Sequence, residues 1–258
     1  MGWWGKLIGS GFGFMLGGPL GALAGAALGH QLDRGLDTVS LSLGNTERTQ
    51  LAFFTASFSV MGYLAKADGQ VSRSEIQMAE HLMAQMNLDT AQRKAAIDLF
   101  NQGKQDDFPL DDVLQQFKSE CHRRTHLLQM FLEILIATAF ADNQLDQAEH
   151  TALLNIAGKI GFSSAQIEPL IEMRRAQQHS GQHSGQARQP SLSQAYTILG
   201  ISADTSDPVL KKTYRRLMSQ HHPDKLVAKG LPEEMIKLAN QKTGEIKAAY
   251  EQIKNSRK

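Results

Sequence analysis

The sequence has very little cysteine and no recognisable site for covalent chemistry. Its one cysteine, Cys121, excludes a disulfide within the chain, and we expect it to be a small buried residue. No nucleophile is paired with a base, no Cys/His spacing is typical of zinc, and no glycine-rich loop is of the phosphate-binding kind. The sequence therefore gives no support to an enzyme, and we expect neither a metal nor a cofactor.

Net charge is also scarce, because 27 Lys and Arg residues stand against 26 Asp and Glu residues. The charges are nevertheless distributed unevenly. Residues 1–29 carry one charged side chain, Lys6; residues 30–175 hold 13 basic and 19 acidic side chains; residues 191–258 hold 12 basic and 7 acidic ones. This distribution predicts an apolar start, an acidic middle and a basic end. A basic end suits nucleic acid, a membrane surface or an acidic protein partner.

An uncharged run of 23 residues extends from Leu7 to Gly29 and follows two tryptophans and Lys6. A helix rises 1.5 Å per residue, so a helix over 7–29 can cross a hydrocarbon core of about 30 Å. Residues 1–30 are therefore predicted to form a single transmembrane helix. A cleaved signal peptide and a soluble hairpin are the alternatives. The run exceeds the apolar region of about 7–15 residues that signal peptides carry.

Glycine recurs at every fourth position of this run. A row of small residues lets helices approach closely in lipid, so we expect a homodimer through the transmembrane helix. The predicted dimer face comprises Gly9, Gly13, Gly17, Gly21 and Gly25. The flanking charges, Lys6 on one side and Arg34 and Arg48 on the other, only slightly favour a cytoplasmic C-terminal side.

Residues 45–176 show helical periodicity throughout and no period-two strand. We predict seven helices there, over residues 46–67, 72–86, 90–103, 109–120, 124–141, 146–160 and 164–176. Four starts match a capping box or a close variant: Ser72-x-x-Glu75, Asp89-x-x-Gln92, Asp146-x-x-Glu149 and Ser163-x-x-Gln166. The helix around Phe131 is apolar nearly all round, so we predict that it is the central core helix.

An internal repeat relates residues 67–75 to residues 141–149, each reading Ala-Asp-(Gly/Asn)-Gln-(Val/Leu) and ending in Glu. The pattern resembles the TerB-like domain named for tellurite resistance, which implies a pseudo-symmetric helical bundle. The acidic residues of the repeat are a candidate patch for a metal or a partner. They are Asp68, Glu75, Asp142 and Glu149. The alternative is that they only build structural turns, which the capping roles of the two glutamates favour.

Residues 177–190 are polar and contain His-Ser-Gly-Gln twice. They have almost no apolar surface to bury, so they are predicted to be a flexible linker. His179 and His183 have a spacing that would suit a metal on a helix, but the glycines between and after them disfavour a helix.

Residues 191–258 carry the most specific pattern. A Tyr-x-x-Leu-Gly segment at Tyr196 precedes a basic helix, and a second helix follows with apolar residues at helical spacing. Pro223 ends the basic helix, because proline disfavours helical geometry in the preceding residue. Two antiparallel helices with facing apolar stripes would leave His222-Pro223-Asp224 at the exposed tip. The predicted packing residues are Tyr196, Leu199, Tyr214, Leu217, Ile246, Ala249, Tyr250 and Ile253.

This combination resembles a J-domain, the DnaJ module that activates DnaK-type chaperone ATPases. The resemblance implies that the tip and the basic helix contact the ATPase. The residues implied are His222, Pro223, Asp224, Lys211, Lys212, Arg215, Arg216 and Lys225. The chain departs from DnaJ in a long segment over 226–232, and no Gly/Phe-rich or zinc-binding region follows the module.

The whole layout resembles the membrane-anchored DnaJ-like co-chaperones of Gram-negative bacteria. The resemblance implies an all-α protein that crosses the inner membrane once, with its C-terminal bulk in the cytoplasm. The expected function is that of a regulatory co-chaperone that stimulates ATP hydrolysis by a DnaK-type partner. The alternative is a membrane-tethered adaptor or stress-sensing scaffold acting through the TerB-like domain. Nucleic-acid binding is disfavoured, because the basic face lacks aromatic side chains for stacking on bases.

Overall fold

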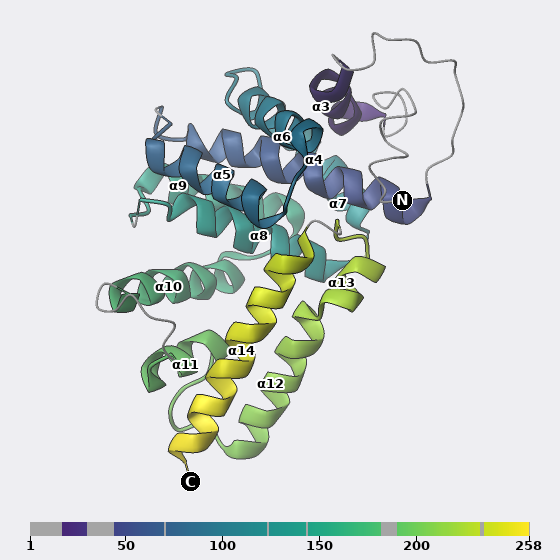
Figure 1. Ribbon diagram of the computed structural model, residues 1–258. Helices are drawn as coiled ribbons and strands as arrows, with labels where there is room; N and C mark the ends of the chain where they lie inside the picture. Colours follow the sequence, from purple (N-terminus) through teal and green to yellow (C-terminus); the bar gives the residue numbers. More distant parts are fainter. Residues whose placement is uncertain are drawn as a thin grey trace.

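The computed structural model describes residues 17–29, 44–69, 71–122, 124–142, 144–181, 190–232 and 235–257. Every regular element in these ranges is a helix, which confirms the all-α class (Figure 1). Two bodies follow a short N-terminal helix. We call residues 44–181 the middle domain and residues 190–257 the J-like module.

The middle domain contains the seven helices that the sequence predicts. They are α4 (Asn45–Ala65), α5 (Arg73–Gln85), α6 (Thr90–Gly103), α7 (Leu110–Cys121), α8 (Thr125–Ala139), α9 (Gln147–Ile160) and α10 (Ser164–Gly181). Most ends lie within two residues of the prediction. The exception is α10, which continues to Gly181 and so includes the first five residues of the predicted linker. The linker residues 182–189 lie outside the described part of the chain.

The central helix of the middle domain is α4, not α8 as the sequence suggested. Sixteen of the 21 residues of α4 are buried, and it packs against α3, α5, α6, α7, α8 and α9. Helix α8 is also deeply buried, including Phe131. Polar residues such as Thr55, Ser57 and Ser59 make α4 less apolar in sequence than α8, so its central position is not evident from the sequence. The Ser59 hydroxyl donates to the Thr55 carbonyl oxygen at 2.8 Å, so this side chain is buried with its hydrogen bond intact. The buried hydroxyls of Thr55 and Ser57 have no hydrogen-bond partner in the described part of the chain.

Helices α4 and α6 approach each other so closely that two glycines are required at their contact. A Cβ on Gly62 would lie 2.0 Å from the carbonyl oxygen of Phe100, and a Cβ on Gly103 would lie 1.7 Å from that of Ser59. Neither backbone oxygen can move without distorting its helix. The glycines cost intrinsic helix stability, which the dense packing around them offsets.

The predicted capping boxes start three helices of the middle domain. Ser72, Asp89 and Asp146 each accept a hydrogen bond from the third residue of the helix, whose side chain accepts one in return. At α10, the Ser163 N–H donates to Gln166 Oε1 at 2.9 Å. The two turns of the internal repeat thus precede capped helices, as the sequence predicts.

The two capping glutamates of the repeat are buried, which changes their titration. Burial raises the pKa of the Glu149 carboxyl to about 8. The hydrogen bond from the Asp146 N–H opposes this rise, and the nearby charges of Asp146, Glu75 and Asp142 add to it. Burial also raises the pKa of Glu75, with Asp68 and Asp142 contributing. The two turns therefore lie close enough in space for their carboxylates to interact.

The N-terminal helix described is α3 (Gly18–Gly29), which packs against α4, α6 and α7. Gln116 of α7 holds its start: the Leu20 N–H donates to Gln116 Oε1 at 2.9 Å, and Gln116 Nε2 donates to the Gly17 carbonyl at 2.8 Å. Within the described residues, no helix is both long and apolar enough to cross a membrane. Residues 7–16 of the predicted span lie outside the described ranges.

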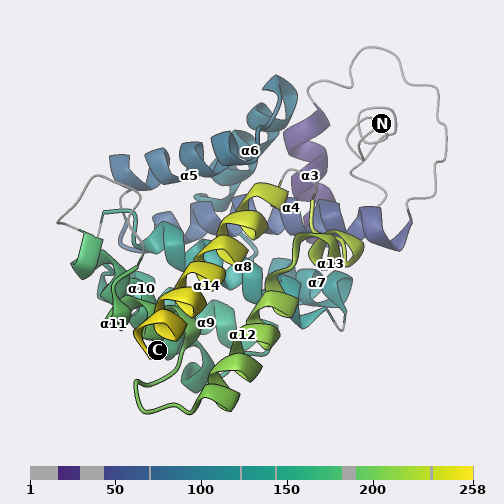
Figure 2. The same ribbon diagram turned by 60° about the horizontal axis from the view of Figure 1, so that its bottom comes forward.

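The J-like module consists of α11 (Leu192–Leu199), α12 (Asp207–His221), α13 (Pro223–Ala228) and α14 (Ile236–Ser256). Helices α12 and α14 form the predicted antiparallel hairpin. The end of the hairpin that carries α13 lies beside α7 of the middle domain in both views, and the C-terminus lies at the far end (Figures 1 and 2). The module is thus docked on the middle domain rather than separate from it.

Gly62→Ala should destabilise the middle domain by about 3 kcal/mol, because the added methyl group overlaps the Phe100 carbonyl. The matched control is Gly158→Ala in α9, where a Cβ would meet nothing within 4 Å. This control should gain up to about 1 kcal/mol from better helix propensity. Thermal unfolding of the whole chain, followed by circular dichroism, measures both. Equal midpoints for the two variants would contradict the close crossing of α4 and α6.

Glu149→Gln should raise the unfolding temperature at pH 9 and leave it nearly unchanged near pH 4. The native carboxyl, with its pKa raised to about 8, holds a proton that the unfolded chain releases near pH 4.3. Its contribution to stability is therefore full below about pH 4.3, is lost progressively as the pH rises from there to about 8, and is absent above that. Glutamine keeps the cap but carries no charge. For Glu172→Gln, at an exposed ion pair with Arg175, the difference from the parent should not change between pH 6 and 9. A flat difference for Glu149→Gln would contradict this account.

Candidate partner-binding site

The His222-Pro223-Asp224 tip lies where α12 passes into α13. His222 has extended backbone angles (φ −62°, ψ 123°) and stands between the two helices, and Pro223 is the first residue of α13. Proline suits a first helical position because its missing N–H needs no partner there. The Leu226 N–H donates to the His222 carbonyl at 3.0 Å. The tip is therefore a rigid corner between two helices rather than an open loop.

The side chains of the tip point to different surroundings. The Asp224 side chain is 91% exposed and that of His222 is 46% exposed, and their carboxylate and ring nitrogen are 3.9 Å apart. The Nδ1 atom of His222 is buried and has no hydrogen-bond partner in the part of the chain described. Asp224 can thus meet a partner directly, while one edge of the imidazole lies against protein.

The predicted basic side chains form one exposed surface next to the tip. Lys211, Lys212, Arg215 and Arg216 are all exposed on α12, and Lys225 is exposed on α13. Lys225 Nζ donates to Ser219 Oγ at 2.7 Å, which ties α13 back to α12. The structure therefore places the predicted basic contact residues on the exposed surface of α12 and on α13, which meet at the tip. Such a surface favours an acidic partner and is weakened by salt.

The module has an apolar core of its own on the opposite side of α12. The rings of Tyr214 and Tyr250 stack with centroids 4.1 Å apart. The buried residues are Ala195, Leu199, Leu210, Ile246, Ala249 and Ile253. All eight predicted packing residues lie in or against this core. Sequence analysis missed Arg257, which closes the open end of the hairpin by donating to Asp207 at 2.6 Å and to the Tyr196 hydroxyl.

Sequence analysis also missed the docking of the module on the middle domain. Leu226, Leu231, Met235 and Ala239 are at most 1% exposed and belong to the apolar core of the middle domain. Gln50 of α4 donates to the Leu231 carbonyl at 3.3 Å. The long segment after Asp224, which distinguishes this chain from DnaJ, supplies much of this contact. Its function is therefore partly structural: it joins two domains.

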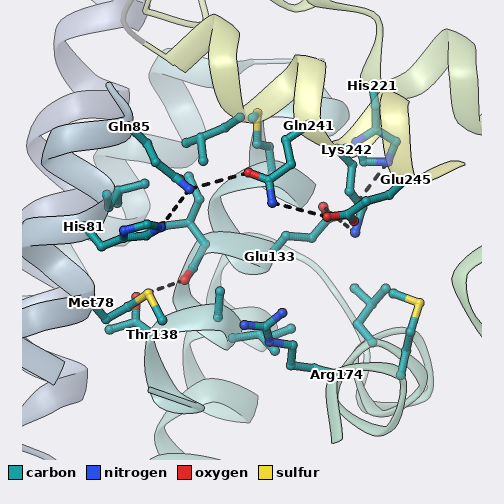
Figure 3. Close-up of a pocket in the computed structure, with 18 residues that line it drawn as sticks. Met78, His81, Gln85, Glu133, Thr138, Arg174, His221, Gln241, Lys242 and Glu245 are labelled. Carbon is teal, nitrogen blue, oxygen red and sulfur yellow. Dashed lines mark hydrogen bonds and ion pairs between the residues drawn. The ribbon is translucent and has the colours of Figure 1, made fainter. Parts of the chain in front are cut away.

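A pocket of about 260 Å³ lies between the two bodies and is lined by α5, α8 and α10 on one side and by α12 and α14 on the other (Figure 3). Glu133 of α8 points toward His221 and Lys242 across it. Gln85 of α5 donates to Gln241 of α14 at 3.5 Å. The pocket is thus bounded by polar contacts between the domains.

The candidate acidic patch does not assemble a metal site in the described residues, where no group of three or more His, Cys, Asp or Glu side chains is arranged to hold an ion. The charges of Asp68 and Asp142 lie close enough to the capping glutamates to affect them: both raise the pKa of Glu75, and Asp142 raises that of Glu149. Asp142 Oδ1 accepts from the Gln144 N–H at 2.9 Å, and both glutamates act as caps. These observations favour the structural-turn alternative.

The glycine row is only partly within the described residues. Gly17 is exposed, Gly21 is buried and Gly25 is half-buried, with α3 lying against the middle domain. Gly9 and Gly13 lie outside the described ranges. Buried Cys121 matches its predicted role as a small core residue, and burial raises the pKa of its thiol.

Three parts of the chain match known families. Residues 1–39 match the model of the co-chaperone DjlA transmembrane domain, residues 54–171 match tellurite resistance protein TerB, and residues 194–258 match the DnaJ domain. The first match supports anchoring in a membrane. The other two agree with the middle domain and the J-like module. No solved structure matches the chain.

Relatives that match over nearly their whole length share one name. The chain is 43% identical to the co-chaperone protein DjlA of Coxiella burnetii over 100% of this chain and 99% of the relative. It is 41% identical to that of Photobacterium profundum, over 98% and 99%, and 40% identical to that of Escherichia coli K12, over 100% and 99%. The chain therefore belongs to the DjlA family of membrane-anchored co-chaperones, a family without enzymatic activity of its own.

Proposed function

We propose that the J-like module stimulates ATP hydrolysis by a DnaK-type chaperone through the His222-Pro223-Asp224 tip. The observation that carries the proposal is the arrangement at the end of α12. An exposed carboxylate and a half-exposed imidazole are held on a rigid corner, next to a surface of exposed Lys and Arg side chains. The family assignment supports the same partner class.

The division of labour follows from the chemistry of the two surfaces. Lys211, Lys212, Arg215 and Arg216 are exposed cations that steer an acidic face of the chaperone toward the module. The tip is the short-range contact, because Pro223 limits its backbone freedom and so lowers the entropy lost on binding. The module carries no group that acts on ATP. It changes the rate of hydrolysis by favouring one conformation of its partner.

The anchor sets where this happens. A DnaK-type chaperone works in the cytosol, so the proposal requires the middle domain and the J-like module on the cytoplasmic side of the inner membrane. The flanking charges agree only weakly with this orientation. Tethering to a membrane keeps the module near proteins at that surface and raises its effective concentration there.

His222→Gln in the full chain should remove most of the stimulation of single-turnover ATP hydrolysis, at least about tenfold, since a contact at the centre of an interface is worth 2 kcal/mol or more. Glutamine keeps similar size and polarity, so the fold is retained. The matched control is His150→Gln in the middle domain, where His150 lies 3.3 Å from Glu168 and far in sequence from the module. That control should stimulate like the parent. Equal activity of all three chains would contradict the role of the tip.

We further propose that two chains pair in the membrane through the glycine row. Gly17→Leu with Gly21→Leu should then lower the yield of cross-linked dimer in lipid several-fold, because large side chains keep the helices apart. The control pair is Ala22→Leu with Ala26→Leu, which has the same spacing at exposed positions of α3. Equal dimer yields for the two double variants would exclude the glycine row as the dimer face.

A further inference from the structure

The J-like module is fixed to the middle domain by apolar burial and by a close backbone approach. Leu231, Met235 and Ala239 are completely buried in the shared core. Gly230 has a φ of +96°, and a Cβ there would lie 2.9 Å from the Thr49 side chain. A glycine is needed at this position for both reasons. The sequence of the module therefore supplies both the apolar residues and the glycine that this contact needs, and the glycine fixes which part of the module lies against α4.

One polar residue of the middle domain reaches both long helices of the module. Glu133 is the only acidic residue of α8, and its side chain is 16% exposed. Its Oε1 lies 3.8 Å from His221 Nε2 of α12, and its Oε2 lies 3.7 Å from Lys242 Nζ of α14 (Figure 3). Gln129 donates to Oε1 at 3.0 Å. A carboxylate this far from water needs such partners, so its position constrains the hairpin.

One of the residues that Glu133 contacts, His221, is adjacent to the tip in the sequence. His221 is the last residue of α12, is 5% exposed, and immediately precedes His222. Burial lowers the pKa of His221; Glu133 opposes this shift, and Lys242, His126 and Arg216 add to it. This lowered pKa favours the neutral form of His221, and the pair of opposite charges at this contact is Glu133 and Lys242.

Docking leaves the charged residues among the predicted contacts exposed. Asp224 and the cations of α12 are exposed in the docked arrangement, whereas the middle domain covers other residues of the module, among them His221, Leu226 and Leu231. The middle domain therefore holds the corner between α12 and α13 without covering the surface that faces a chaperone. An ordered contact surface loses less entropy on binding than a mobile one.

We propose that Glu133 is a positioning residue for the His222-Pro223-Asp224 tip, acting through His221 and Lys242 to hold the docked module in the orientation that binds the chaperone. The inference rests on the proposed function, since it concerns the affinity of the same tip. The middle domain then contributes to chaperone binding and does not serve only as a spacer between the anchor and the module. Anything that loosens its contact with the module lowers the affinity for the chaperone.

The test is a titration of single-turnover ATP hydrolysis by a DnaK-type chaperone with the full-length chain in lipid nanodiscs. Glu133→Gln should raise the concentration for half-maximal stimulation by about three- to tenfold, because Lys242 loses its buried counter-charge. The maximal rate should not change, since the tip itself is intact. The matched control is Glu168→Gln, which also removes a glutamate facing a histidine but lies wholly within the middle domain. It should leave both values unchanged.

Docking is measured separately by cross-linking. Cysteines at Gln85 and Gln241, whose side chains are 3.5 Å apart, are joined with a short bifunctional thiol reagent, while the native Cys121 is buried. Glu133→Gln should lower the yield, and Glu168→Gln should not. The charge swap of Glu133→Lys with Lys242→Glu should recover part of the yield and of the affinity, which a variant that only disturbs packing would not do.

Two results would overturn the inference. If Glu133→Gln changes neither the half-maximal concentration nor the cross-linking yield, Glu133 does not position the module. If the variant stimulates at lower concentrations than the parent, docking restrains the module instead of presenting it. Absence of stimulation by the parent chain would overturn the proposed function itself. In that case the cross-linking yields would still test whether Glu133 holds the docked module in place. Equal yields for the parent and Glu133→Gln would reject that role as well.

Discussion

The burial of α4 on all sides is the constraint on which the rest of the structure depends. Because α6 crosses α4 at Gly62 and Gly103 with backbone nearly touching backbone, the other helices of the middle domain can surround a single axis. This arrangement places α8 on the side of α4 where the J-like module docks. It also lets Gln50 of α4 reach the module directly. The dense centre thus determines where the His222-Pro223-Asp224 tip is held.

Acidic side chains have different roles in different parts of the structure. The two carboxylates that cap the repeated turns stabilise the fold, whereas the carboxylate of the tip is exposed at the surface. Glu75 and Glu149 are buried, accept hydrogen bonds from backbone N–H groups and have raised pKa values. Asp224 is almost wholly exposed. Glu133 stands between these cases: it is mostly buried, but its charged partner belongs to the other domain. Burial and partners, rather than residue type, decide what each acid does.

Membrane anchoring and docking act together on the tip. The family match places a transmembrane segment at the start of the chain, and the docked module follows the middle domain as one body. The position of the tip relative to the middle domain is therefore defined, although a polar linker precedes α11. A tethered but freely rotating module would present the same residues with a greater loss of entropy on binding.

The sequence by itself determined the local features. Helical periodicity and capping boxes predicted the seven helices of the middle domain, and the spacing around His222-Pro223-Asp224 predicted the hairpin, its core and its basic surface. These depend on residues close together in the chain. Tertiary structure alone decided that α4 rather than α8 is central, that Gly230 meets Thr49, and that Glu133 faces His221 and Lys242. The physical reason is separation: Gln50 and Leu231 are 181 residues apart, and no local pattern specifies which distant apolar or charged groups will pack together.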